Sequence, residues 1–303
     1  LVSLTFMIDA WMSRPSIPEG AQQPTQLLLS PFIFHVSNTL WHAAAAIAFF
    51  ALMTIAGAPR PLRVLAPLLY VVHPLHTEAV TYISGRADPM AGALVLGALC
   101  CALAFPANRN VVWSSILFIA ALLSKESATI YPFLVLLAAV VLRPSQKPDE
   151  AETTAKRSLM LPLIAAGVIV GVYAALRFTV LRFAARGESV ASSFIQRLTE
   201  AGQAFALYVK LLFVPANLHM ERTLDGVPGW AGAVGWVLIV AFAATAFVAY
   251  TAKRERLAFA LGFFLITWLP ISGIFPLNAP MADHWMYLPM LGFIWALFEI
   301  VWM

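Results

Sequence analysis

The stretch AGAVGWVLIVAFAATAFVAYT at positions 231–251 decides the fold class of this sequence. It carries no charged residue, and it is as long as the run of about 20 apolar residues that an α-helix needs to cross a bilayer. Within a single segment, a helix is the conformation that satisfies every backbone hydrogen bond in hydrocarbon. The stretch therefore predicts a transmembrane α-helix.

Similar apolar runs recur along the chain. The sequence is 61% hydrophobic and 11% charged with a mean hydropathy of +0.83, which is too apolar for an ordinary soluble domain. The segment 203–215, ended by Pro215, is expected to be interfacial or re-entrant. We predict an all-α, polytopic transmembrane helical bundle with about nine spans. The predicted spans lie at 36–57, 64–73, 89–105, 111–124, 127–142, 159–180, 231–251, 257–275 and 287–303.

Basic residues mark one side of this bundle. Ten of the 19 lysines and arginines lie in four short loops, which the positive-inside rule places in the cytoplasm. Topology therefore explains the net charge of +4 better than nucleic-acid binding does. These residues are Arg60, Arg63, Arg109, Arg143, Lys147, Lys156, Arg157, Lys253, Arg254 and Arg256.

The remaining loops follow from this orientation. The segment 144–158 has the composition of a solvated cytoplasmic loop. Two crossings between Arg109 and Arg143 place Lys125 and Glu126 in an exoplasmic turn. The other predicted exoplasmic segments are 1–35, which is expected to be interfacial, 74–88, 181–230 and 276–286.

Several classes of site find no support in the sequence. Cys100 and Cys101 are adjacent in an apolar run, so neither a disulfide framework nor a thiolate metal site is expected. There is no Gly-rich phosphate loop, no HExxH motif and no repeat of roughly 30–45 residues. These absences argue against a soluble nucleotide site.

The densest polar cluster is HPLHTEAVTYISGRAD at 73–88. If 75–88 is helical, His76, Thr77, Glu78 and Tyr82 share a face, and Arg86 lies one turn beyond. A carboxylate can accept a proton from a hydroxyl, while imidazole and guanidinium groups bind phosphate. Two alternatives remain: an ion pair from Arg86 to Glu78 or Asp88 that only fixes the loop, and a metal held by His73, His76 and Glu78, for which the spacing is weak.

Three other polar positions have both a structural and a functional interpretation. Lys125 and Glu126 form either a self-satisfied ion pair or a cation directed at an anionic headgroup. Asp283, His284 and Tyr287 precede the last run and belong either to an aromatic interface belt or to a site. Asp9 fits an amphipathic interfacial helix, and we assign it no catalytic role.

Charged residues in the long external segment carry less information. They are expected to face solvent or lipid headgroups. They are Arg177, Arg182, Arg186, Arg197, Glu221, Arg222 and Asp225.

Six motifs in order resemble the transmembrane and tetratricopeptide-repeat O-mannosyltransferases and their bacterial relatives, members of the GT-C superfamily of glycosyltransferases. The motifs are LVSLTFMIDAW at 1–11, FHVSNTLWHAAAA at 34–46, HPLHTEAVTYISGRAD at 73–88, LLSKESATIYP at 122–132, LLFVPANL at 211–218 and WLPISGIFPLNAPMADHWMYLPMLG at 268–292. The resemblance covers nearly the whole sequence and implies a single transmembrane glycosyltransferase-like domain over 1–303.

The resemblance implies an enzyme that moves a sugar, with mannose as one candidate, from a polyprenyl-phosphate carrier to a hydroxyl on the exoplasmic side. The acceptor would be a protein or glycan, and the setting a bacterial inner membrane or the endoplasmic reticulum. No cofactor is expected, a metal requirement has no support in the sequence, and nucleic acid is not an expected partner.

The resemblance also suggests residue roles. Glu78 and Asp88 are catalytic candidates, and His73, His76, Arg86 and Lys125 are candidates for binding the donor phosphate. Glu126, Asp283, His284 and Tyr287 are secondary candidates. His284 stands where relatives commonly carry Arg, so it would bind phosphate in a pH-dependent way.

Two further expectations concern the part of the protein beyond this sequence and the alternative functions. The main base of the superfamily lies in the first exoplasmic loop, which we expect upstream of Leu1 in an excerpt that lacks the first span and the repeats. The rival functions are a secondary transporter, for which no two-half symmetry is visible, and a non-catalytic membrane scaffold.

Overall fold

A computed structural model describes residues 1–13, 29–104, 107–142, 151–181, 193–275 and 277–303. These residues form helices and turns, and the β-structure among them is one isolated antiparallel bridge between Arg222 and Met281. The all-α prediction is confirmed. Parts of the predicted segments 1–35, 144–158, 181–230 and 276–286 lie outside the described residues.

Four apolar stretches in the described chain are long enough to cross a membrane. They are Pro31–Ile55, which is α2; Ile83–Ala104, which includes α5 (Ala87–Ala104); Leu159–Val180, most of which is α8 (Ala151–Leu176); and Trp230–Thr251, which is α10. Shorter helices occupy other predicted runs: α3 (Arg60–Val72), α6 (Ala107–Leu122), α7 (Tyr131–Val141) and α12 (Pro289–Trp302). The number of about nine spans stays a prediction.

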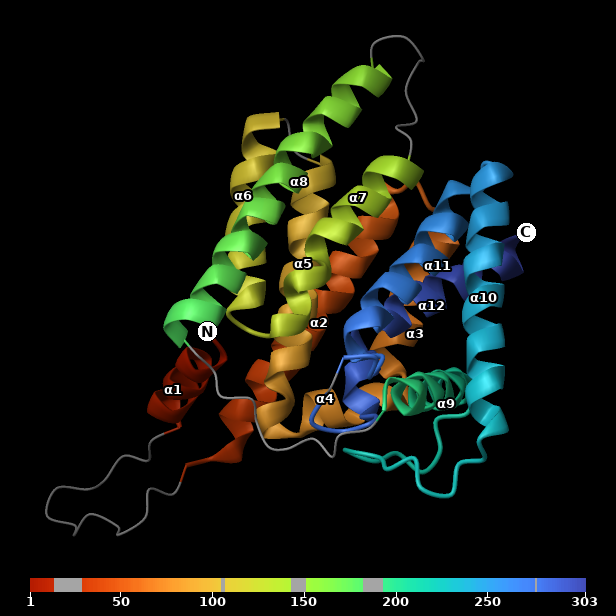
Figure 1. Cartoon of the computed structure of the whole chain (residues 1–303). Coiled ribbons are helices and arrows are strands. Elements are labelled where there is room, and N and C mark those ends of the chain that lie inside the picture. The colour runs from red at the N-terminus through yellow and green to blue at the C-terminus, as the bar shows by residue number, and fades with distance from the viewer. Residues whose placement is uncertain (14–28, 105–106, 143–150, 182–192, 276) are drawn as a thin grey trace, which may run out of the picture.

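The long helices differ in how deeply they are buried. Figure 1 shows α5 inside the bundle beside α2 and α6, whereas α8 and α10 lie on its outside. Few side chains of α10 and of the described part of α8 are buried, whereas most of those of α5 are buried. Exposed apolar faces on the outer helices fit contact with lipid. The core is built around α2, α5, α11 (Glu255–Trp268) and α12.

The polar stretch at 73–88 does not form one continuous helix, so the condition under which its polar side chains share a face is not met. It folds as η1 (Pro74–His76), α4 (Thr77–Thr81) and η2 (Ile83–Arg86), with Tyr82 in an extended conformation between the last two. The Asn38 amide donates to the carbonyls of Val80, Tyr82 and Ile83 at 3.1–3.3 Å. These hydrogen bonds satisfy backbone groups that the interrupted helix leaves open.

The predicted run 257–275 is also interrupted. Helix α11 ends at Trp268, and the chain continues as the short η5 (Leu269–Ile271). Pro270 lacks the N–H that another α-helical turn would need, so the second half of this prediction is wrong. The break turns the chain toward the site described below.

Helix α9 (Phe194–Phe213) covers the predicted interfacial segment and ends before Pro215. In Figure 1 it crosses α10 near one end of the bundle. Small residues let the two backbones approach closely: a Cβ atom on Gly235 would overlap the carbonyl of Gly202, and one on Gly202 would overlap the carbonyl of Gly232. The Trp236 indole adds a hydrogen bond to the Leu198 carbonyl at 2.8 Å.

The contact between α9 and α10 predicts the effect of a single methyl group. Gly235→Ala should lower the melting temperature in detergent or nanodiscs, because overpacking costs about 1–3 kcal/mol. Gly171→Ala on α8 is the matched control, since a Cβ atom there meets nothing within 4 Å. Equal melting temperatures for the two variants would contradict the close packing.

Candidate functional site

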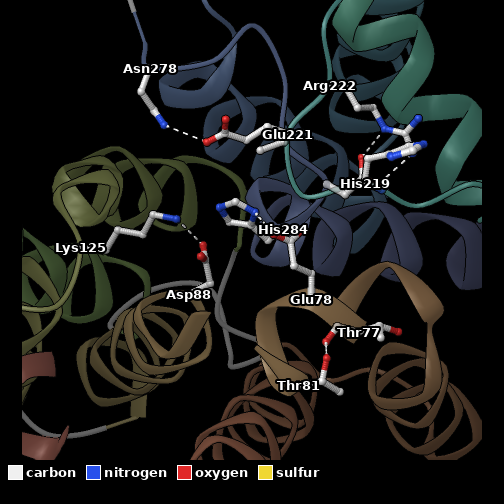
Figure 2. A network of polar contacts seen from close by, with 12 residues as sticks. Thr77, Glu78, Thr81, Asp88, Lys125, His219, Glu221, Arg222, Asn278 and His284 are labelled. Carbon is white, nitrogen blue, oxygen red and sulfur yellow. Dashed lines mark hydrogen bonds and ion pairs between the residues drawn. The ribbon is translucent and has the colours of Figure 1, made fainter. Parts of the chain in front are cut away.

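Three turns converge at one end of the bundle. They are the segment 73–86 between α3 and α5, the segment 123–130 with η3 (Glu126–Ile130), and η6 (Asp283–Tyr287) before α12. The turn η6 contacts η1, α4 and α5. Figure 2 shows that these turns bring Glu78, Asp88, Lys125 and His284 together around one space.

Lys125 and Asp88 form the first ion pair of this site. The Lys125 ammonium lies 2.5 Å from Asp88 Oδ1, and 22% and 10% of the two side chains are exposed. Asp88 stands in the first turn of α5, where the helix dipole favours a negative charge. A lysine carries three donors, so the pair leaves donors on Lys125 for another partner.

Glu78 and His284 form the second pair. His284 Nδ1 lies 3.1 Å from Glu78 Oε1, and each side chain is 20% exposed. Burial raises the pKa of Glu78 above its ordinary value of 4.5, the imidazole of His284 acts in the opposite direction, and the carboxylates of Asp283 and Asp88 raise it further. The second oxygen, Oε2, is buried without a hydrogen-bond partner. This oxygen remains available to a ligand.

A cavity opens beside the first pair. It is small, with a volume of about 30 Å³, and is partly open to solvent. Asp88, Lys125, Ser127 and Thr267 supply its polar lining. Its apolar lining includes Val95, Ile130, Ile271, Trp285, Leu288 and Pro289. The cavity thus combines charged groups with a larger apolar wall.

Arg86 does not reach this cavity. Its side chain is fully buried and pairs with Asp9, and its guanidinium donates to Asn38 Oδ1 at 2.6 Å and to Thr5 Oγ1 at 3.1 Å. A further bond goes to the Phe34 carbonyl at 3.2 Å. The guanidinium of Arg86 is therefore bound by protein groups, and the alternative ion pairs of Arg86 with Glu78 or Asp88 do not form. Arg86 instead fixes α1 (Val2–Met12) against α2 and η2.

His73 and His76 have structural surroundings. His73 Nε2 donates to the Leu212 carbonyl at 3.2 Å, and its Nδ1 accepts from the Leu75 N–H at 3.3 Å, which defines a neutral tautomer. His76 is 2% exposed and packs against the rings of Tyr70 and Tyr287. Burial lowers the pKa of His76 well below its ordinary value. Neither histidine lines the cavity, both ring nitrogens of His76 are buried without a hydrogen-bond partner, and the phosphate-binding role of the two residues stays a prediction.

The possibility of a metal held by His73, His76 and Glu78 gains no support from the geometry. Within the described ranges, no three His, Cys, Asp or Glu side chains are placed to hold a metal ion.

The secondary candidates have separate partners. Glu126 pairs with Arg177 at 2.6 Å, so Lys125 and Glu126 do not satisfy each other. Tyr287 is buried, and its hydroxyl lies 2.7 Å from His42 Nδ1. Asp283 pairs with Arg222 at 2.7 Å. Of the secondary candidates, His284 is the one placed beside Glu78.

Sequence reasoning missed three residues around the site. Asn38, Asp9 and Arg222 were given no functional weight, yet each binds a residue of the site motifs. Asn38 had a usable signal, because an amide inside an apolar run must find a hydrogen-bond partner. Arg222 had none, since it lies 61 positions from Asp283.

The fold and the site together define an all-α, membrane-type helical bundle with two carboxylate–base pairs at one end, Asp88 with Lys125 and Glu78 with His284, and a small cavity beside the first pair. Such a set can hold an anion beside a group that accepts a proton.

Comparison with known proteins then narrows this class. Protein O-mannosyl-transferase TMTC4 of Mus musculus is 25% identical over 352 residues, covering 97% of this chain and 45% of the relative. TMTC3 of Mus musculus is 33% identical over 92 residues, covering 29% and 10%. TMTC2 of Xenopus laevis is 36% identical over 87 residues, covering 29% and 10%.

The curated relatives are TMTC-type protein O-mannosyl-transferases, and the resemblance inferred from the motifs is confirmed. The chain spans less than half the length of these relatives. No protein-family model matches the chain, and no solved structure matches it.

The raised pKa of Glu78 makes stability depend on pH. Protonated Glu78 contributes stability that is fully present below pH 4.5 and is lost as the pH rises through the higher pKa of the folded state. Glu78→Gln stays neutral, so its melting temperature should rise relative to wild type between pH 4.5 and neutrality. Glu221→Gln, at an exposed glutamate, is the control. A difference for Glu78→Gln that stays constant with pH would contradict the assignment.

The buried position of Arg86 predicts a large loss of stability. Arg86→Met leaves Asp9 buried without its counter-charge, which costs about 3–5 kcal/mol. Arg177→Met makes the same change at a pair with exposed side chains, where the cost is about 0–1 kcal/mol. Thermal unfolding of both variants measures the difference. Equal falls in melting temperature for the two variants would contradict the idea that the buried Arg86–Asp9 pair matters more to stability than the Arg177–Glu126 pair.

Proposed function

We propose that this chain is the membrane part of a glycosyltransferase that moves a sugar from a polyprenyl-phosphate carrier to a hydroxyl of a protein acceptor. Mannose is the first sugar to test, because the matching relatives are named protein O-mannosyl-transferases. The observation that carries the proposal is the cavity in which Lys125 and Asp88 meet a larger apolar wall. A phosphate on a hydrocarbon chain needs a cation and an apolar surface side by side.

The proposed reaction is a single displacement. The acceptor oxygen forms a bond to the anomeric carbon, and the bond from that carbon to the phosphate oxygen breaks. The electron pair leaves with the phosphate, and the acceptor proton goes to a carboxylate. Asp88 lines the cavity and Glu78 lies beside His284, so these two carboxylates are the proposed acceptors of the proton within this chain.

Two side chains supply positive charge for the leaving phosphate. Lys125 keeps donors beyond its bond to Asp88, and His284 lies beside Glu78 on the other side of the space (Figure 2). Fixed charges placed where negative charge develops stabilise the transition state. Arg86 supports the fold of this region in the proposal and does not touch the phosphate.

The side of the membrane is part of the proposal. Arg256 pairs with Glu299 near the end of α12 and donates to the Gly57 carbonyl, so the α2–α3 and α10–α11 loops meet at the end opposite η6. This end also carries Arg60 and Arg63 in the first turn of α3 and Lys253 and Arg254 in the α10–α11 loop. By the positive-inside rule that end is cytoplasmic, which supports an exoplasmic site.

Lys125→Met tests the proposal in the full-length protein. Transfer of labelled mannose from dolichyl-phosphate mannose to an acceptor peptide should fall by roughly 10²–10³-fold, as when one transition-state donor is removed. Lys253→Met, an exposed lysine near the opposite end, should keep the wild-type rate. Equal rates for the two variants would remove Lys125 from the mechanism. Solute uptake by wild-type proteoliposomes without transfer would favour the transporter instead.

A further inference from the structure

The segment 214–229 between α9 and α10 folds back onto the chain that precedes η6. The Arg222 N–H donates to the Met281 carbonyl at 2.9 Å, and this bond forms the isolated bridge of the structure. The Arg222 guanidinium also donates to the Asn217 carbonyl within its own segment. Arg222 therefore joins two parts of the chain through both its backbone and its side chain.

Asp283 receives this side chain in a fixed geometry. Its Oδ1 accepts from Arg222 Nε at 2.7 Å, and its Oδ2 accepts from Nη2 at 2.9 Å and from the His219 N–H at 2.7 Å. The residue is 1% exposed. Bidentate arginine–carboxylate pairs fix orientation as well as distance. Both oxygens are engaged by protein, so Asp283 has little capacity to bind a substrate.

The residues before His284 are held one after another. Met281 is held by the Arg222 backbone, and Asp283 by the Arg222 side chain. Between them, the Ala282 carbonyl accepts from the Tyr208 hydroxyl at 3.0 Å, and the Ala282 N–H donates to the same hydroxyl at 3.2 Å. His284 follows directly and places Nδ1 at 3.1 Å from Glu78. The location of the His284 ring thus depends on contacts made by its neighbours.

We propose that Arg222 and Asp283 are positioning residues that hold His284 against Glu78. The expected effect on sugar transfer rests on the proposed function of the site. The positioning of His284 by Arg222 and Asp283 does not depend on that function. It gives Arg222 a role that its place in a polar external segment did not suggest. It also makes the segment 217–222 a structural part of the site.

A second ion pair in the chain provides a matched control. Arg256 and Glu299 also join an arginine to a buried carboxylate, at 2.8 Å, near the far end of α12. Their loss removes an arginine–carboxylate bond without touching η6. A purely structural role for Arg222 and Asp283 predicts the same behaviour from both pairs.

The activity experiment is a double-mutant cycle in the full-length protein. Arg222→Gln and Asp283→Asn should each lower transfer by up to roughly 10²-fold, the scale reported for misplacing a reacting group by about 1 Å. The double variant should lose no more than the stronger single variant, since both changes break one contact. Arg222→Lys keeps the positive charge but cannot make the bidentate hydrogen bonds, so its rate should lie between those of Arg222→Gln and wild type. Arg256→Gln and Glu299→Gln should keep the rate in folded protein.

A spectroscopic readout separates this inference from the proposed function. The infrared carboxylic-acid band of Glu78 is identified by its loss in Glu78→Gln. His284, Asp283 and Asp88 are the titratable groups that face Glu78. If Arg222→Gln lets His284 move away, the Glu78 band should persist to higher pH than in wild type, and Arg256→Gln should leave it unchanged.

The outcomes are distinct. An unchanged Glu78 titration in Arg222→Gln would overturn the positioning role, whether or not the protein transfers sugar. A shifted titration with no transfer by wild-type protein would reject the proposed function and keep the positioning role. A further result would also overturn the positioning role. It is a loss of transfer in the Arg222 and Asp283 variants no larger than in Arg256 and Glu299 variants whose melting temperature falls by the same amount.

Discussion

The surroundings of the site depend on one buried ion pair, between the guanidinium of Arg86 and the carboxylate of Asp9. A charge inside an apolar bundle is tolerated when a counter-charge and hydrogen bonds replace water. Asp9 supplies the charge, and Asn38, Thr5 and the Phe34 carbonyl supply acceptors. Because these groups come from α1 and α2, one side chain ties two helices to η2, immediately before the helix that carries Asp88.

Asn38 connects that contact to the shape of the polar stretch. Its oxygen accepts from Arg86, while its amide donates to carbonyls of 80–83 where the helix breaks. The break lets Glu78 and Asp88 approach the same space from different elements.

The site is assembled from contacts of long range in sequence. Lys125 reaches Asp88 from the turn between α6 and α7, and His284 reaches Glu78 from η6. Glu78 comes from the short helix α4, Asp88 from the first turn of α5, Lys125 from the residue before η3 and His284 from η6. At the opposite end, Arg256 and Glu299 fasten α11 to α12. Ionisable side chains near the ends of these apolar helices thus lie beside groups of opposite sign.

The sequence by itself determined the fold class. A charge-free run such as 231–251 can satisfy its backbone in lipid only as a helix, and six motifs in order, with 73–88 the most specific, indicated the resemblance. The sequence also singled out Glu78, Asp88, Lys125 and His284 among its candidates. Tertiary structure alone decided which of the charged residues meet. Arg86 and Asp9 lie far apart in sequence, as do Arg222 and Asp283, and no local pattern marks either pair. An ion pair depends on distance in space and on the loss of water around it, and both are set only when the helices pack.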